Sequence, residues 1–485
     1  MEKANIFILN IGSKTGETLS KDVLYGAWCR GRKVGLQEYP PLPLLYTNTL
    51  LNKNGFKTVF LDAQGEKINH SHLLKKYDWN KFDYLITQTA TMTFNEDLEL
   101  LTSIKARNPK IKIIVFGSHV TFLPEKSLES GIIDFVIRRE PEFPLLNLID
   151  ALVNKKNFEK INGLAFKKGK KYIINPFDEH KDLSQLPFPD RKPILHINYY
   201  NPLVSSKKWT TIETTRGCPS KCTFCTAPYF FGVRIRKRSV DSVIEELKYL
   251  YHVGYQEIFF RDEIFTFEKE RVKEICNRMI NEKIKLKWIC NGKIGMLDRE
   301  TMNLMKKAGC RIILFGVESG DQKILNNMKK GITIKQTRET FKWAREIGMR
   351  THAHFMIGNP GDNKETVERT IALAKELKPT TVDFGILTVY PGTELCDQLS
   401  KKMDRSWDGT EATISVLHVK SFRNELFTDL TAEEIENYLI TAYKSFYTRP
   451  TYILQKLISI RSPQEIYSLM KAGFGILLLV LQKKN

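Results

Sequence analysis

Short apolar runs and amphipathic stretches alternate along this chain in two series, and this alternation restricts the possible folds more than any other feature. The first series contains five candidate strands, at residues 6–9, 58–61, 84–87, 111–116 and 135–137. Buried, β-branched strands that alternate with helices predict a parallel sheet covered on both faces. We therefore expect an α/β fold whose residues 1–154 form a doubly wound, Rossmann-like domain, with a ligand outside the carboxyl ends of its strands.

The second series is more regular and contains six strand–helix units. Its candidate strands are residues 210–214, 257–260, 287–290, 312–317, 351–357 and 382–389. Six parallel units can form a partial (β/α)6 version of the TIM-type barrel, with its site at the carboxyl ends of the strands. We assign residues 209–400 to this barrel. Residues 155–208, rich in proline, are expected to form a linker with a small hairpin at 163–174, and residues 401–485 a helical C-terminal region.

Composition places the chain among ordinary globular proteins. Its 485 residues include 75 Lys and Arg against 55 Asp and Glu, a surplus of 20 positive charges. Such a surplus favours anionic partners, although a lysine-rich surface without any partner explains it at least as well. The longest apolar run, residues 472–481, is too short to span a membrane, and the first residues carry no secretory signal. With only eight cysteines, the chain is expected in the reducing cytoplasm.

Three of the cysteines lie close together, directly after the first strand of the second series. Cys218, Cys222 and Cys225 follow one another at spacings of four and three. A loop there can place three thiolates around a [4Fe–4S] cluster and leave one iron open to a substrate or cofactor. The alternative is structural zinc, which needs a fourth ligand. That ligand would be remote, because the next cysteine, Cys276, lies in a helix-like stretch.

The cysteine loop at the head of six strand–helix units resembles the radical S-adenosylmethionine (SAM) superfamily. Segments at the ends of later predicted strands strengthen the resemblance, namely residues 315–320, 356–361 and 390–393. Segments of the first domain are similar to the branch of that superfamily with an N-terminal cobalamin-binding domain, namely residues 39–45, 55–59 with Asp62, 117–120 and 133–142. The resemblance covers about residues 5–400.

The resemblance implies that Cys218, Cys222 and Cys225 hold the cluster and that the amino and carboxylate groups of SAM chelate the fourth iron. It implies further SAM contacts: Phe224 and Gly358 at the adenine, Asp262 and Glu263 at the methionine amino group, and Glu318 and Ser319 at the ribose hydroxyls or the methionine carboxylate. A helix cap or salt bridge is an equal alternative for the Asp262–Glu263 pair. Reductive cleavage of SAM, with electrons from a donor such as flavodoxin or ferredoxin, would produce a 5′-deoxyadenosyl radical.

The resemblance also implies that three loops of the first domain touch the corrin ring or its nucleotide tail. The residues concerned are Thr89, Gly117, Ser118, His119 and Glu140. Amides and hydroxyls in these loops can pair with the corrin side amides. The D-x-H-x-x-G motif, which supplies a cobalt-binding histidine in many B12 proteins, is absent, and Arg139 stands where the family has glycine. A domain retained only for packing is the alternative.

Three weaker features complete the analysis. His352 and His354 share one face of a predicted strand, where they can serve a proton step or bind substrate, or simply pack through hydrogen bonds. The basic run 234–238 can hold a phosphate or an acidic substrate, or it can precede a helix. Residues 444–484 are basic with an apolar end, so they can rest peripherally on an anionic membrane or contact a lipid-like substrate, or dock on the barrel.

The sequence therefore predicts a cobalamin-dependent radical SAM enzyme that methylates an unactivated carbon of a small-molecule or lipid-like substrate. Oxidative ring formation, as in the anaerobic magnesium-protoporphyrin ester cyclases, is the alternative within this class. A nucleic-acid-binding zinc protein is the alternative outside it, although no aromatic ladder accompanies the basic run. Methylthiolation of tRNA would require a second cysteine trio, and the first domain holds only Cys29. Neither the substrate nor a catalytic side chain can be named.

Overall fold

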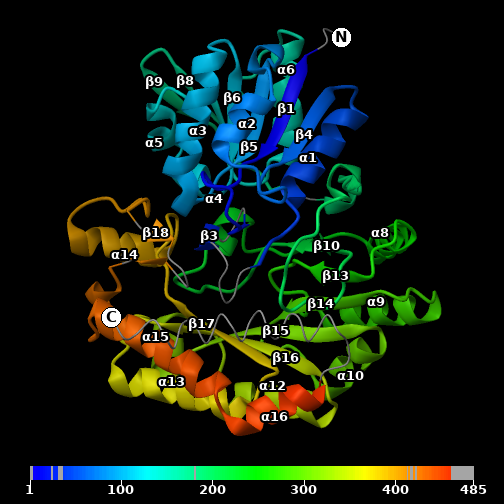
Figure 1. The fold of residues 1–485 in the computed structure, drawn as a ribbon, viewed down its shortest axis with the longest axis vertical. Helices are drawn as coiled ribbons and strands as arrows, with labels where there is room; N and C mark the ends of the chain where they lie inside the picture. The colour runs from blue at the N-terminus through cyan, green and yellow to red at the C-terminus, as the bar shows by residue number, and fades with distance from the viewer. Residues whose placement is uncertain are drawn as a thin grey trace.

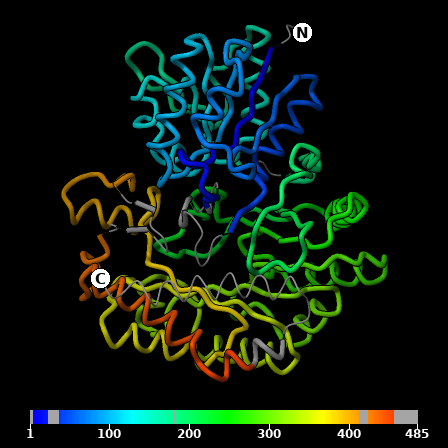
Figure 2. The backbone as a smooth tube through the Cα atoms, viewed as in Figure 1, coloured from blue at the N-terminus to red at the C-terminus, as the bar shows by residue number. Residues whose placement is uncertain are grey.

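The computed structural model describes residues 4–22, 26–30, 37–179, 182–411, 413–414, 419–420 and 423–459. Two large sheets organise these residues, one in each of two lobes that are stacked along the long axis of the molecule (Figures 1 and 2). The mixed α/β architecture confirms the predicted fold class.

The first sheet has a parallel core in the order β4-β1-β5-β6-β7. Its strands are β1 (Asn5–Asn10), β4 (Lys57–Asp62), β5 (Tyr84–Gln88), β6 (Lys112–Phe116) and β7 (Phe135–Ile137). This is the flavodoxin-like order, in which the chain reverses direction across the sheet between β1 and β5. The predicted hairpin is present as β8 (Leu164–Lys168) and β9 (Lys171–Ile174), and it extends this sheet antiparallel to β7. Residues assigned to the linker thus join the first lobe.

Helices cover both faces of the first sheet, as its buried strands predict. Side chains of α2, α3, α4 and α5 pack on one face, and those of α1 and α6 pack on the other. The bounds are α1 Leu42–Lys53, α2 His70–Lys76, η1 Trp79–Lys81, η2 Thr91–Thr93, α3 Phe94–Arg107, α4 Ser118–Phe122, α5 Pro124–Glu129 and α6 Glu142–Val153. A hairpin of β2 (Leu19–Asp22) and β3 (Gly26–Arg30) follows β1. The turns η3 (Leu183–Gln185) and η4 (Lys192–Ile194) lie in the connection to the second lobe.

The second sheet consists of six parallel strands in chain order, which confirms the partial barrel. The strands are β10 (Trp209–Ile212), β13 (Glu257–Phe260), β14 (Lys287–Gly292), β15 (Cys310–Glu318), β16 (Arg350–Ile357) and β17 (Thr381–Ile386). The helices are α7 Ala227–Phe230, α8 Val240–His252, α9 Lys269–Asn281, α10 Arg299–Lys307, α11 Gln322–Asn327, α12 Ile334–Glu346, α13 Lys364–Leu377 and α14 Glu394–Met403. Two short strands, β11 (Thr215–Arg216) and β12 (Arg236–Lys237), pair across the cysteine loop.

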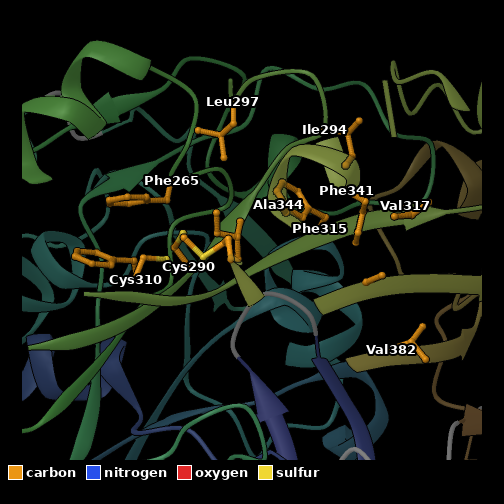
Figure 3. Close-up of a cluster of buried hydrophobic side chains, with 14 of the residues drawn as sticks. Phe265, Cys290, Ile294, Leu297, Cys310, Phe315, Val317, Phe341, Ala344 and Val382 are labelled. Carbon is orange, nitrogen blue, oxygen red and sulfur yellow. The ribbon is translucent and has the colours of Figure 1, made fainter. Parts of the chain in front are cut away.

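The outer face of the barrel sheet packs against its helices in one continuous core, part of which is drawn in Figure 3. Phe315 on β15 lies against Phe341 on α12, with ring centroids 5.6 Å apart. Cys276, Cys290 and Cys310 belong to this core, and Cys290 and Cys310 are labelled in the figure. These thiols therefore serve as small apolar side chains.

The C-terminal helices close the open edge of the barrel. Tyr443 and Tyr447 on α15 (Ala432–Tyr447) place their hydroxyls on the free backbone groups of β17, at Phe384 and Val382. This pairing protects an edge strand that would otherwise expose its hydrogen-bonding groups. Helix α16 (Pro450–Ser459) follows, as predicted.

The stretch before α15 differs from the predicted helical region. Besides helices, the region from residue 401 holds a short strand pair, β18 (Thr413–Ile414) and β19 (Val419–Lys420), and the turn η5 (Asn424–Leu426). Of the basic segment predicted at residues 444–484, the structure describes positions 444–459, at the end of α15 and in α16, while the apolar end lies outside the described residues. Among the helices in the described ranges, none combines the length and apolarity needed to cross a membrane.

Candidate functional site

The cysteine loop occupies the carboxyl end of the first barrel strand, where it was predicted. Cys218 and Cys222 are buried, and Cys225 is half-buried. Gly217 has φ +108°, and a Cβ there would lie 2.2 Å from the carbonyl oxygen of Arg234. Glycine therefore lets the loop pass close to the segment that leads into β12, while the Cys218 amide donates to Gly232.

The three thiols lie close enough to influence one another. Burial raises the pKa of Cys225, and the neighbouring Cys222 and Cys218 add to the increase. Within the described ranges, the single group that brings three potential ligand atoms within 4.8 Å of one another lies elsewhere, on β16 and β17. The cysteine sulfurs are thus spread more widely than tetrahedral zinc requires, since Zn–S bonds of about 2.3 Å place sulfurs roughly 3.8 Å apart.

A buried ion pair stands beside these thiols. Lys330, which follows α11, donates to Glu318 at the end of β15 over 2.6 Å. Burial lowers the pKa of Lys330 and the Glu318 carboxylate raises it, with a net increase. Burial raises the pKa of the Cys222 thiol, and the Lys330 ammonium offsets part of this increase. Gly316 leaves room for the pair, because a Cβ there would lie 2.2 Å from Glu318 Oε1. Lys330 also lies 5.9 Å from the centre of the Phe224 ring.

The carboxylates after β13 have separate roles. Both oxygens of Asp262 accept hydrogen bonds from Thr214, through its amide and its hydroxyl. Asp262 therefore joins two strand ends within the fold, and its expected contact with SAM stays a prediction. Glu263 is half-buried, and its buried Oε2 has no hydrogen-bond partner among the described residues. A ligand ammonium in this position would satisfy that oxygen.

The remaining SAM candidates lie at the same end of the barrel. Phe224 is half-buried and packs against the hydrophobic core. Ser319 is buried and its hydroxyl pairs with Thr370, so its hydrogen-bonding capacity is partly used within the fold. Gly358 has φ +82°, and its carbonyl accepts from the Asn424 side chain. These three assignments stay predictions.

The facing edge of the first sheet carries buried polar atoms that the protein itself does not satisfy. Within the described part of the chain, the Ser118 hydroxyl and both ring nitrogens of His119 have no hydrogen-bond partner. The His119 ring lies 4.2 Å from that of Phe94, and burial lowers the pKa of His119 to about 4. Buried polar groups are normally paired, so this edge fits a ligand rich in amides, such as cobalamin.

Backbone geometry shapes the same edge. Gly117 has φ +122°, and a Cβ there would lie 2.2 Å from the carbonyl oxygen of Thr89. Only glycine allows the β5 and β6 loops to approach this closely. The Thr89 hydroxyl donates to Asp97, which also forms a buried salt bridge with Lys21 of β2. The structure thus ties Thr89 into the protein's own network.

A buried network of charges joins the two lobes beside the cysteine loop. Arg216, two residues before Cys218, pairs with Glu140 at 2.8 Å and with Glu142 at 2.6 Å. Arg236 on β12 reaches the other oxygen of Glu140 at 2.5 Å. Both carboxylate oxygens of Glu140 are thus taken by arginines. Glu140 is therefore part of the interface, which we call the interlobe clamp: Glu140, Glu142, Arg216 and Arg236. Its expected contact with cobalamin stays a prediction.

Arg139 occupies a strained backbone position. Its φ of +62° lies in the left-handed region, which favours glycine over a residue with a side chain. The guanidinium instead stacks on Phe177, 5.0 Å from the ring centre, in the segment after the hairpin.

A cleft between the two sheet edges brings both lobes into one site. It lies at the switch point of the first sheet, where Asn10 ends β1 and Gln88 ends β5. From the second lobe it is lined by residues that follow β10 and β13, namely Glu213, Arg216, Arg261 and Glu263. Burial raises the pKa of Glu213 to about 7, although the nearby Arg216 guanidinium offsets part of the increase.

Sequence reasoning missed Arg216, Lys330, Glu213 and Arg261. The position of Arg216 directly before the cysteine loop was a signal, because an arginine that is buried there needs an anionic partner. The partners of the other three are decided only by the packing of the two lobes and the barrel loops.

Comparisons with known proteins agree with this geometry. Residues 212–374 match the Radical SAM superfamily, and residues 32–149 match the B12 binding domain. An uncharacterized methyltransferase of Pyrococcus horikoshii is 31% identical over 428 residues, which span 86% of this chain and 90% of the relative. The chain belongs to the cobalamin-binding branch of the radical SAM superfamily. It is therefore an enzyme of that superfamily, and the expected cofactors, a [4Fe–4S] cluster, SAM and cobalamin, are those of its family.

Other relatives are more distant. An anaerobic magnesium-protoporphyrin IX monomethyl ester cyclase of Cereibacter sphaeroides is 29% identical over 381 residues, which span 76% of this chain and 61% of the cyclase. Among solved structures, the radical SAM methyltransferase TsrM of Kitasatospora setae has a TM-score of 0.67 at 19% identity and covers 82% of this chain and 76% of its own. The cobalamin-dependent enzyme OxsB has a TM-score of 0.72 at 16% identity, with coverage of 99% and 72%. These two structures share the fold.

Proposed function

We propose that this enzyme transfers a methyl group from cobalamin to a carbon atom of a small-molecule substrate. The observation that carries the proposal is a cleft shared by the two lobes, lined at the carboxyl ends of β1 and β5 from the first sheet and by residues that follow β10 and β13 from the second. When bound, the cluster and SAM supply a substrate-activating radical and cobalamin supplies the methyl group. Two cofactor sites that face each other allow one substrate to meet both.

In this proposal the chain's own residues bind and orient. Cys218, Cys222 and Cys225 hold the cluster at the mouth of the barrel. The unpaired oxygen of Glu263 accepts from the SAM ammonium. Ser118 and His119 pair with corrin side amides on the opposite edge. The interlobe clamp keeps the two edges at a constant separation, because breaking it would leave charges buried without partners.

Three finer points belong to the same proposal. A flavodoxin or ferredoxin delivers the electrons, the reaction takes place in the cytoplasm, and a small or lipid-like molecule is the substrate. The named methyltransferases among the relatives support methylation, including a cytidylyl-2-hydroxyethylphosphonate methyltransferase of Streptomyces wedmorensis at 24% identity over 414 residues. The cyclase relatives keep oxidative ring formation as the second candidate.

The test uses SAM with a deuterated methyl group and does not require the substrate. Enzyme purified anaerobically, reconstituted with iron, sulfide and cobalamin, is reduced in the presence of the labelled SAM. We expect label on the corrin, detected by mass spectrometry, and labelled products when a small-molecule cell extract is added. A Cys218→Ala variant should keep cobalamin but form no 5′-deoxyadenosine. Unlabelled products that have lost two hydrogens would instead support the cyclase.

A further inference from the structure

Two histidines and a carboxylate gather on the inner wall of the barrel, apart from the cysteine loop. His352 and His354 lie on β16, and Asp383 lies on the neighbouring β17 directly opposite His354 in the strand register. The alternate residues of β16, Ala353 and Phe355, belong to the hydrophobic core on the helix side of the sheet. The two histidines therefore face the barrel interior.

The three side chains converge closely. His354 Nδ1 lies 2.6 Å from Asp383 Oδ1, and His352 Nε2 lies 3.6 Å from the same oxygen. One ligand atom from each residue falls within 4.8 Å of the others. Ligands bonded to one transition-metal ion at about 2.0–2.1 Å lie roughly 3–3.5 Å apart. Small side-chain shifts would thus suffice to enclose an ion.

The surroundings suit a metal site rather than simple packing. The His352 ring is held at its other nitrogen by the Thr381 hydroxyl, 2.7 Å from Nδ1, in the way that a second shell orients a ligating histidine. His352 is buried, while about a third of the surface of the His354 and Asp383 side chains is exposed.

We propose that His352, His354 and Asp383 bind one divalent first-row metal ion, with Zn²⁺ or Fe²⁺ as the best match. Imidazole nitrogen and carboxylate oxygen suit these ions, and two histidines with one carboxylate leave coordination positions open. The open coordination positions of the metal ion would face the barrel interior, where an oxygen atom of a substrate can bind. The proposal goes beyond methyl transfer and does not depend on it, because it rests on the ligand geometry alone.

The test measures binding of Zn²⁺ itself to the reconstituted holoenzyme after removal of loosely bound metal with a chelator. We expect about one zinc per chain, with iron and sulfide contents unchanged, and an X-ray absorption spectrum that shows nitrogen and oxygen ligands without sulfur. His354→Ala and Asp383→Asn should weaken binding at least tenfold. Thr381→Val, which removes only the second-shell contact, should weaken it roughly 10–100-fold.

His252→Ala, on an exposed position of α8, is the matched control and should bind zinc like the parent. Absence of stoichiometric zinc in the parent would overturn the proposal, as would sulfur ligands or a loss of iron as zinc binds. If the alanine variant loses its cluster, the parent's absorption spectrum and the nearly isosteric Asp383→Asn variant still decide the question. Equal binding by parent and Asp383→Asn would mean that the three side chains form only a hydrogen-bonded group.

Discussion

The two sheet edges that face each other in this enzyme use different means to prepare a cofactor site. The barrel edge concentrates its proposed cluster ligands in eight residues of one loop, from Cys218 to Cys225. The edge of the first sheet has no such segment. It spreads its candidates over the ends of β5 and β6 and leaves Ser118 and His119 without partners among the described residues.

The difference follows from the ligands. A metal cluster forms strong bonds to a few thiolates, so a short loop can hold it. A corrin is large and binds through many weak contacts, so its site must be assembled from several loops of a rigid sheet. The interlobe clamp connects the two edges by setting the carboxylates of one lobe against the arginines of the other.

The largest expected effect concerns the barrel edge alone. Cys222→Ala should reduce cluster iron to near zero and abolish reductive cleavage of SAM, because two thiolates cannot hold the cluster. Iron, sulfide and 5′-deoxyadenosine measured on one sample provide the check. The control is Cys396→Ala, since that thiol packs in a separate hydrophobic cluster. Retention of the full iron content by Cys222→Ala would contradict the ligand assignment.

The next largest effect is expected from a substitution in the interlobe clamp, which connects the two edges. Arg216→Met should destabilise the protein by about 3–5 kcal/mol, because Glu140 and Glu142 lose a buried partner. Denaturant unfolding provides the measurement. Arg338→Met removes an exposed ion pair with Glu376 and should cost no more than about 1 kcal/mol. Equal losses in the two variants would show that the clamp carries no special stability.

A pH-dependent effect sharpens the description of the first-sheet edge. Burial lowers the pKa of His119 from 6.5 to about 4, so the folded state disfavours the imidazolium. The contribution of the neutral His119 ring to the free energy of unfolding is fully present above pH 6.5. It decreases by about 3 kcal/mol as the pH falls toward 4. His119→Phe preserves the contact with Phe94 and should remove this slope. Unfolding curves without cobalamin at pH 7 and pH 4.5 test it, with His252→Gln as the unchanged control.

The smallest expected effect is a change at Gly117 on the first-sheet edge, which should alter the cobalt content of the protein but not its iron content. Gly117→Ala should cost about 1–3 kcal/mol, because only glycine tolerates its backbone angles and the nearby Thr89 carbonyl. Cobalt content should fall while iron per chain is unchanged. Gly131→Ala, whose Cβ would meet nothing within 4 Å, should leave cobalt as in the parent. Parallel losses of iron and cobalt in Gly117→Ala would mean that the edges are not independent.

Much of the fold and part of the site could be predicted from the sequence. Both strand series were located, as was the loop of Cys218, because strand periodicity and thiol spacing are local properties. The protein partners of Asp262 and Glu140 were not predicted. Each carboxylate was interpreted from its place after a strand, whereas its partner comes from a distant part of the chain, Thr214 for Asp262 and the arginines for Glu140.

The sequence alone thus determined the class of enzyme, since its motifs lie in single segments whose chemistry depends on neighbouring residues. Tertiary structure decided which lobe faces which, how Lys330 comes to stand beside Cys222, and that His354 meets Asp383 across two strands. These contacts between residues distant in the sequence depend on the strand order and on how whole sheets pack. Burial makes each of these pairs matter for stability, because a charged side chain that is removed from water costs free energy unless it has a partner.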